Sequence, residues 1–318
     1  VYRMEVKLGG ELWFEATLDT LDFGVARDMN AHAYYPVWAR EKDQIHRLHR
    51  LPGNRLPIYE RASRSGELNV PADSSIVMEV KMIDVHGNES FREVELRGLE
   101  HAALEVDARS NRFNLKYDRA FDWVDSTGLR VEIPSGAFYE DSWFPCHSVP
   151  GGWQIGSSDL PASKYFLVEL PENAGCGARG HVAIRTESSE IEDVIPARLL
   201  AGGGLRFESR TPGLYSVACD TLAPVIQVRS NRPSGLPERP NSRALQFEVT
   251  DDLSGVASIE AWVDGCWIRM QWDPKKSRAY YLLEDGRHLA GTTQEVVLEA
   301  KDESGNVAQW RGAIHWPQ

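Results

Sequence analysis

The chain has 318 residues, more than the ~100–200 residues of one typical domain, so we expect two or three domains. Hydrophobic residues make up 42% and charged residues 26% of it, which is typical of globular proteins. Acidic residues outnumber basic ones by 47 to 35, giving a formal net charge of −12, and no segment is basic. This charge argues against nucleic acids and anionic membrane surfaces as partners. No apolar run approaches the ~20 residues that a transmembrane helix needs.

The first residues, VYRMEVKL, alternate like a strand and show neither an initiator Met nor a signal-peptide pattern. We therefore expect that a segment preceding Val1 has been removed. Apolar residues occupy even positions on both sides of Gly9-Gly10. A two-residue turn would put the two apolar sets on opposite faces, whereas an odd-length loop, or a bulge, would pair Leu8 with Leu12 and keep one face buried. Of these two we expect the odd-length loop.

Residues 24–60 interrupt the alternation with a polar, His- and Arg-rich stretch of partly helical spacing. Alternation returns at Ile76 and ends in the turn DVHGN at Asp84. The same unit, strand–DxxGN–strand, recurs near the C-terminus at Asp302. Asp bonds the amides of such a turn and Gly supplies its positive φ. The repeat predicts at least two sandwich-like domains.

Short alternating runs fill the rest of the chain and end at Gly, Pro, Asn or Asp. This pattern predicts an all-β protein of three tandem immunoglobulin-like antiparallel β-sandwiches, with a short helical insertion in the first. We place the boundaries near residues 98 and 220. The predicted domains are residues 1–98 with the insertion at about 24–60, residues 99–220, and residues 221–318.

The segment IEAWVDGCWIRMQW carries Asp264-Gly265, a strong signal for a two-residue hairpin turn. The predicted register pairs Val263 with Cys266 and extends to Ile259 and Met270 on one face, which makes Cys266 a buried thiol. The other face then carries the pair Trp262–Trp267 beside the ion pair Glu260–Arg269. Packing beneath a neighbouring loop or domain is the favoured explanation of the tryptophans. The alternative is an aromatic platform that binds a sugar ring or a protein.

The four cysteines are Cys146, Cys176, Cys219 and Cys266, and none forms a Cys-x-x-Cys pair, which argues against zinc-ribbon or thioredoxin-like chemistry. A bridge from Cys146 to Cys176 remains open. The motif GxGxxG at residues 175–180 lies between two predicted strands, so we interpret it as a glycine loop and not as a dinucleotide site.

Two groups of residues suggest metal ligands. His46 and His49 have a spacing that puts both on one face of a helix, but no HExxH accompanies them, and a solvated helix face is favoured. The clusters Asp251-Asp252 and Asp302-Glu303, with Asp220, are candidates for Ca²⁺, although they do not match an EF-hand loop and turn chemistry explains them better. We therefore assign no metal site, and whether Ca²⁺ binds at the Asp-rich turns stays open.

Several blocks carry a family resemblance. The C-terminal blocks LQFEVTDDLSGVASIEAWVDGC and VVLEAKDESGNVAQW resemble a bacterial immunoglobulin-like domain. Together with LDFGVARDMNAHAYY, LPGNRLPIYER, LRVEIPSGAFYED and TPGLYSVACDT, their order resembles the region downstream of the catalytic domain in envelope lysostaphin/LytM-type zinc metallopeptidases of Gram-negative bacteria. That family binds zinc through His-x-x-x-Asp and His-x-His, and neither motif occurs here. The resemblance implies a catalytic domain, with its zinc, outside this chain.

The sequence thus predicts a non-catalytic accessory region of a periplasmic or surface peptidoglycan hydrolase, with the peptidase domain or another envelope protein as partner. No catalytic residue and no cofactor is assigned. A second hypothesis is a stand-alone glycan- or protein-binding module or adhesin that uses the Trp262/Trp267 face. A third is an enzyme with an unrecognised site around His32, Tyr34, His46 and His49.

Overall fold

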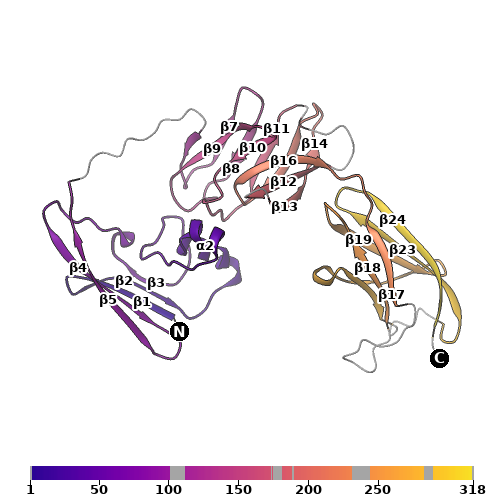
Figure 1. Ribbon diagram of the computed structural model, residues 1–318, viewed down its shortest axis with the longest axis horizontal. Helices are drawn as coiled ribbons and strands as arrows, with labels where there is room; N and C mark the ends of the chain where they lie inside the picture. Colours follow the sequence, from indigo (N-terminus) through magenta and orange to yellow (C-terminus); the bar gives the residue numbers. More distant parts are fainter. Residues whose placement is uncertain are drawn as a thin grey trace. The chain divides into compact units, whose positions relative to one another are not determined.

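The computed structural model describes residues 2–100, 112–172, 174, 181–187, 190–230, 244–282 and 289–316. These residues form five antiparallel sheets joined by turns and a few short helices, which confirms the all-β prediction. Figure 1 shows three successive groups of strands along the chain. The chain divides into two compact units, Val1–Glu169 with Glu208–Tyr215, and Leu170–Phe207 with Ser216–Gln318. The predicted boundaries near residues 98 and 220 stay a prediction.

The N-terminal group is one five-stranded sheet of order β3-β2-β1-β4-β5. Its strands are β1 (Tyr2–Leu8), β2 (Glu11–Leu18), β3 (Tyr59–Ala62), β4 (Ser75–Ile83) and β5 (Glu89–Arg97). Within the described residues 2–98 no second sheet faces it. One face packs instead against the predicted insertion, which contributes Leu56 and Ile58 to a core with Met4, Val6 and Phe14.

The insertion consists of short helices joined by irregular backbone. They are η1 (Phe23–Asp28), α1 (Met29–His32) and α2 (Tyr35–Glu41), and the short helix η2 (Ser63–Gly66) follows β3. Asp22 begins η1 by accepting a hydrogen bond from the Gly24 amide, and α2 ends at Lys42 in the left-handed conformation. The longest helix of the described residues, α2, has seven residues, and none of these helices qualifies as a membrane span.

The β1–β2 hairpin corrects the predicted loop. Both turn glycines have positive φ, 55° and 88°, and form a two-residue turn that pairs Leu8 with Glu11, so the predicted pairing of Leu8 with Leu12 is wrong. A bulge beside this turn shifts the register, and Val6 then pairs with Phe14. The bulge takes the place of the expected odd-length loop, because it returns both apolar sets to one face.

The middle strands form two sheets of orders β13-β12-β16-β10-β9-β6 and β14-β15-β11-β8-β7. Their bounds are β6 (Arg112–Leu115), β7 (Phe121–Val124), β8 (Arg130–Ile133), β9 (Ser142–Val149), β10 (Gly152–Ile155), β11 (Phe166–Leu170), β12 (His181–Glu187), β13 (Glu190–Pro196), β14 (Arg198–Leu199), β15 (Leu205–Ser209) and β16 (Gly213–Cys219). The hydroxyl of the fully buried Tyr215 donates to the Thr211 carbonyl and forms a second hydrogen bond with the Ser209 hydroxyl, and these bonds fix the turn that precedes β16.

The C-terminal strands form two four-stranded sheets of orders β17-β18-β22-β21 and β20-β19-β23-β24. Their bounds are β17 (Val225–Ser230), β18 (Ala244–Thr250), β19 (Val256–Val263), β20 (Cys266–Ile268), β21 (Gln271–Asp273), β22 (Arg278–Leu282), β23 (Thr293–Asp302) and β24 (Val307–His315), with the short helix η3 (Pro274–Lys276) before β22. Their shared core includes Phe247 and Tyr281 from one sheet and Ala261, Leu298 and Ile314 from the other.

Both DxxGN turns form as predicted. Asp84 and Asp302 each accept hydrogen bonds from the amide and the side chain of the Asn four residues later. The glycine before each Asn has φ of 82° and 91°, which requires a residue without a Cβ. The two turns differ in burial, because Asp84 is exposed whereas Asp302 is 1% exposed.

The cysteines correct a further prediction. Cys146 is a buried free thiol on β9, so the bridge from Cys146 to Cys176 is wrong. Cys219 is disulfide-bonded. Burial raises the pKa of the Cys146 thiol, which keeps it protonated and unreactive.

Candidate functional site

A cavity of about 380 Å³ lies on the face of the β14-β15-β11-β8-β7 sheet that carries charged side chains. Asp122 on β7 pairs with Glu132 on β8, and Glu132 pairs in turn with Leu167 on β11, so the three side chains share one face. Glu208 on β15 lines the same cavity. The lining combines apolar side chains such as Leu167 with the carboxylates of Asp122, Glu132 and Glu208, which we call the acidic margin.

Tyr165 supplies an aromatic wall to this cavity. It precedes β11 and is 52% exposed, so a large part of its ring is open to solvent. The Arg210 guanidinium lies 4.9 Å from the ring centroid, within the range of a cation–π contact. This contact restrains the orientation of the ring.

A charged network orders the acidic margin. Arg130 donates to both carboxylate oxygens of Asp122 at 2.9 and 2.7 Å and contacts Glu132 at 2.9 Å. The hydrogen bonds from Arg130 lower the pKa of the Asp122 carboxyl. The Asp122 carboxylate is therefore held as an oriented hydrogen-bond acceptor, and Glu132 is tied to the same guanidinium. An aromatic ring beside fixed acceptors and a guanidinium suits a flat, polyhydroxylated ligand.

None of these cavity residues belongs to a site that the sequence predicts. Their only sequence signal is the alternation of polar positions in FDWV and RVEI, which indicates strands with one solvated face. The cavity needs β7, β8, β11 and β15 to be neighbours, and that order depends on contacts between residues far apart in the sequence.

The predicted tryptophan hairpin forms around the Asp264-Gly265 turn. Trp262 pairs with Trp267, and Trp267 is 53% exposed whereas Trp262 is half-buried. The prediction for Cys266 is wrong, because this residue is exposed beside the turn at the tip of the hairpin. The aromatic platform stays a prediction.

The hairpin is shorter than predicted. β20 ends at Ile268 and the chain crosses to the other sheet as β21, so the predicted pair of Glu260 with Arg269 does not form. On the opposite side of β19, Glu260 pairs with Glu299 of β23. Glu260 and Arg269 form no ion pair within the described part of the chain. Met270 packs against the core, but it no longer pairs with Ile259.

The structure brings only some of the histidines of the insertion together. His32 is buried, its Nδ1 lies 3.2 Å from the Tyr59 hydroxyl, and its ring centroid lies 5.2 Å from that of His46. The predicted helix over His46 and His49 is wrong, since His46 forms a β-bridge with Ala33. His49 lines a separate cavity of about 490 Å³.

The electrostatics of the histidines favour a structural role. Burial, followed by the nearby His46 and two other basic residues, lowers the pKa of His32 to about 4. Tyr34 is 42% exposed and stacks on the Arg47 guanidinium. A neutral imidazole enclosed by aromatic rings and cations is suited to packing, and the hypothesis of an enzyme site here stays untested.

One set of three potential metal ligands forms within the described residues. Asp220, Asp251 and Asp302 each present a carboxylate oxygen within 4.8 Å of the others. Each also makes the turn hydrogen bonds that its local sequence predicts. The sequence therefore explained each aspartate separately, and their convergence is a feature of the fold.

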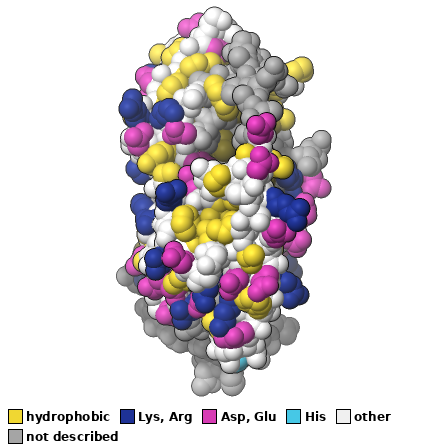
Figure 2. Space-filling view, turned by 90° about the vertical axis from the view of Figure 1, so that its left-hand side faces the viewer, with side chains coloured by type: hydrophobic (Ala, Val, Ile, Leu, Met, Phe, Trp, Pro, Cys, Tyr) yellow, Lys and Arg dark blue, Asp and Glu magenta, His cyan; other side chains and the backbone are white. Residues whose placement is uncertain are grey.

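On the face drawn in Figure 2, acidic and basic side chains are interspersed without a continuous basic area. The residues 175–180, which carry GxGxxG, lie outside the described residues.

No family model matches the chain, and no curated protein does. Among solved structures, it is similar to SGBP-B of the Bacteroides ovatus mixed-linkage glucan utilization locus, solved in complex with a mixed-linkage heptasaccharide. The identity is 7% and the TM-score 0.19, with 99% of this chain and 60% of that chain covered. The chain thus spans less than two thirds of that structure, and at this TM-score the similarity carries no argument about function.

Proposed function

We propose that this chain is an extracytoplasmic β-sandwich module that binds glycan in the cavity bounded by Tyr165, Glu132 and Glu208. The observation that supports this is a half-exposed aromatic ring held beside ordered carboxylates. The C–H face of a pyranose packs on an aromatic ring, and its hydroxyls donate to carboxylates. A cavity of about 380 Å³ accommodates a short stretch of a polysaccharide and not a folded partner.

Two further features support immunoglobulin-like modules, a common architecture of cell-surface proteins. The C-terminal sheet orders correspond to the ABED and CFG sheets of an immunoglobulin sandwich with one added strand. The hydrogen bond from the Tyr215 hydroxyl to the Thr211 carbonyl resembles the tyrosine corner of such folds.

The accessory region of an envelope peptidase remains a proposal of the same kind. It is supported by the order of the sequence blocks, one of which, LRVEIPSGAFYED, contains Glu132 of the cavity. If it holds, the bound glycan is peptidoglycan. The reading frame upstream of Val1 tests it, because it must then encode His-x-x-x-Asp and His-x-His.

A retention experiment tests glycan binding. The full chain is run through affinity gels that contain soluble β-glucan and is pelleted with insoluble peptidoglycan. We expect one of these two glycans to retain the wild-type chain. The Tyr165→Ala and Glu208→Gln variants should bind that glycan at least tenfold more weakly. Phe23→Ala, which removes a 97% exposed aromatic in the insertion, is the matched control and must retain binding.

A Trp267→Ala variant separates the two candidate surfaces. Loss of retention in this variant, with full retention by Tyr165→Ala, would move the glycan site to the hairpin. Absence of retention by either glycan at millimolar saccharide would overturn the proposal.

A further inference from the structure

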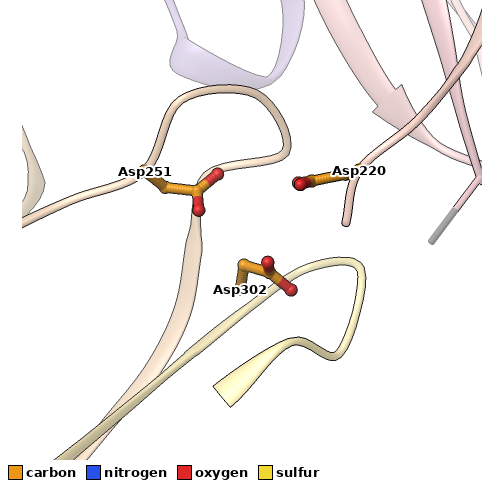
Figure 3. A group of neighbouring side chains, drawn as sticks. All are labelled: Asp220, Asp251 and Asp302. Atoms are coloured by element: carbon orange, nitrogen blue, oxygen red, sulfur yellow. The ribbon is translucent and has the colours of Figure 1, made fainter. Parts of the chain in front are cut away.

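Three aspartates from distant parts of the sequence meet at one end of the C-terminal sandwich. Asp220 follows β16, Asp251 follows β18, and Asp302 ends β23. Figure 3 shows the Asp251 carboxylate pointing toward those of Asp220 and Asp302. One oxygen from each lies within 4.8 Å of the other two, and Asp220 and Asp302 are only 2% and 1% exposed.

The groups that donate hydrogen bonds to these three carboxylates are all neutral. Asp220 accepts from the amides of Leu222 and Ser254. Asp251 Oδ2 accepts from two amides of its own loop, and Asp302 accepts from the amide and side chain of Asn306. Within the described residues, no Lys, Arg or His lies within ion-pair distance of the three. Their negative charges are therefore uncompensated in a largely buried setting, which is energetically costly.

Two polar oxygens at this place lack the partners that burial demands. Asp251 Oδ1 is shielded from solvent and accepts no hydrogen bond. Ser254, whose amide donates to Asp220 at 3.0 Å, is 9% exposed and its hydroxyl also has no partner. Buried polar groups are nearly always satisfied, so unpaired acceptors beside three carboxylates indicate a bound positive ligand.

The turn at Asp84 is an internal control. It has the same sequence pattern as the Asp302 turn and the same hydrogen bonds to its asparagine. Asp84 is nevertheless exposed and belongs to no such cluster in the part of the chain that the structure covers. Turn chemistry therefore accounts for the local bonds of Asp302 and leaves its burial beside two other carboxylates unexplained.

We propose that Asp220, Asp251 and Asp302 bind one Ca²⁺ ion. Carboxylate and hydroxyl oxygens are the ligands of a hard cation, and the cluster offers no nitrogen or sulfur for zinc. Ca²⁺ accepts irregular sets of six to eight oxygens, whereas Mg²⁺ demands a near-ideal octahedron, so loops from three parts of the chain favour Ca²⁺.

The ion joins three segments that hydrogen bonds already link, among them those from the Ser254 amide to Asp220 and from the Glu303 amide to the Gly255 carbonyl. The three segments are the loop after β18, the DxxGN turn after β23, and the segment between β16 and β17, which Asn306 also contacts through the carbonyls of Asp220 and Leu222. Because the ion requires the folded arrangement of all three, it stabilises the C-terminal sandwich in proportion to the logarithm of free Ca²⁺. This inference is independent of the proposed glycan site.

Calorimetry and thermal melting of the full chain test the site after treatment with a chelating resin. We expect titration with CaCl₂ to show one binding event and to raise the melting temperature, and equal MgCl₂ to act at least tenfold more weakly. Asp251→Asn, at the half-buried ligand, is expected to abolish both Ca²⁺ effects without loss of folding. Asp84→Asn is the matched control and must leave both effects unchanged.

The alternative is that the three carboxylates share protons and bind no cation. In that case CaCl₂ gives no binding heat up to about 10 mM, roughly ten times the dissociation constant of the weakest extracellular sites. Asp251→Asn then raises the melting temperature by removing repulsion. Either that result, or Ca²⁺ binding that survives Asp251→Asn and Asp302→Asn, overturns the proposal.

Discussion

The Tyr139 hydroxyl donates a hydrogen bond of 2.9 Å to the Asp28 carboxylate, although the two residues are 111 positions apart in the sequence. Both are buried, at 2% and 0% exposure. Arg55 donates to both oxygens of the same carboxylate, and the Tyr139 carbonyl accepts from the Gly53 amide at 2.7 Å. One buried acid therefore connects the insertion of the first sheet to the loop before β9.

Replacement of Tyr139 by Phe tests this connection. The variant removes one of the two hydrogen bonds that Asp28 Oδ1 accepts, while Arg55 keeps the other. Hydrogen bonds to charged groups contribute about 1.5–3 kcal/mol. We expect the free energy of unfolding to fall by that amount in a denaturant titration. Tyr280→Phe is the control, because Tyr280 makes no hydrogen bond through its hydroxyl in the described structure, and its loss is expected to stay below ~0.5 kcal/mol. Equal losses in both variants would contradict the assigned role of Asp28.

The buried His32 predicts a loss of stability in mild acid. Its pKa is about 4 in the folded chain, against 6.5 in the unfolded one. Between these values the unfolded state binds a proton that the folded state does not, so stability is lost as the pH falls from about 6.5 to about 4 and changes no further below that through this group. The pKa difference corresponds to about 3 kcal/mol at most.

A His32→Gln variant measured across this pH range is expected to show a flatter stability profile. His86→Gln, at an exposed turn position, is the matched control and should keep the wild-type profile. Burial also lowers the pKa of His46 and His49, so part of the acid sensitivity will remain in the variant. An unchanged profile after His32→Gln would show that His32 is already solvated.

The sequence predicted features that depend on neighbouring residues. The Asp264-Gly265 hairpin and both DxxGN turns are encoded within a few positions, and all three form. The prediction failed where alternation does not report the pairing of strands. The strand after Ile268 crosses to the other sheet, and Cys266 is exposed at the tip of the hairpin. Alternation gives the face of a residue but not the length over which a partner strand covers it.

The candidate sites were visible only in fragments for the same reason. Each aspartate of the Ca²⁺ cluster occupies a recognisable turn, yet three turns meet only because β18 and β23 end at the same edge of the sandwich. Tyr165 and Glu208 carry no local signal at all. Their juxtaposition follows from strand order, which composition and periodicity leave undetermined.

Gly312 is expected to tolerate no side chain. A Cβ at this position would lie 2.4 and 2.5 Å from atoms of the Trp310 ring, which in turn packs against Phe247 at 5.0 Å between ring centroids. Because the half-buried Trp310 ring must shift from its contact with Phe247 to make room, we expect Gly312→Ala to cost about 1–3 kcal/mol of unfolding free energy. The double variant Gly312→Ala/Trp310→Leu separates the clash from other effects, since a smaller residue at 310 should make the alanine nearly neutral.

The two free thiols are expected to differ sharply in reactivity. Cys266 is exposed at the hairpin tip, whereas Cys146 is 1% exposed and burial raises its pKa, so little thiolate forms there at neutral pH. Brief treatment of the native chain with iodoacetamide, followed by peptide mapping in a mass spectrometer, should find the label on Cys266 and not on Cys146. After denaturation without reductant both should be labelled. Labelling of native Cys146 at a comparable rate would mean that the sheet opens around β9 in solution.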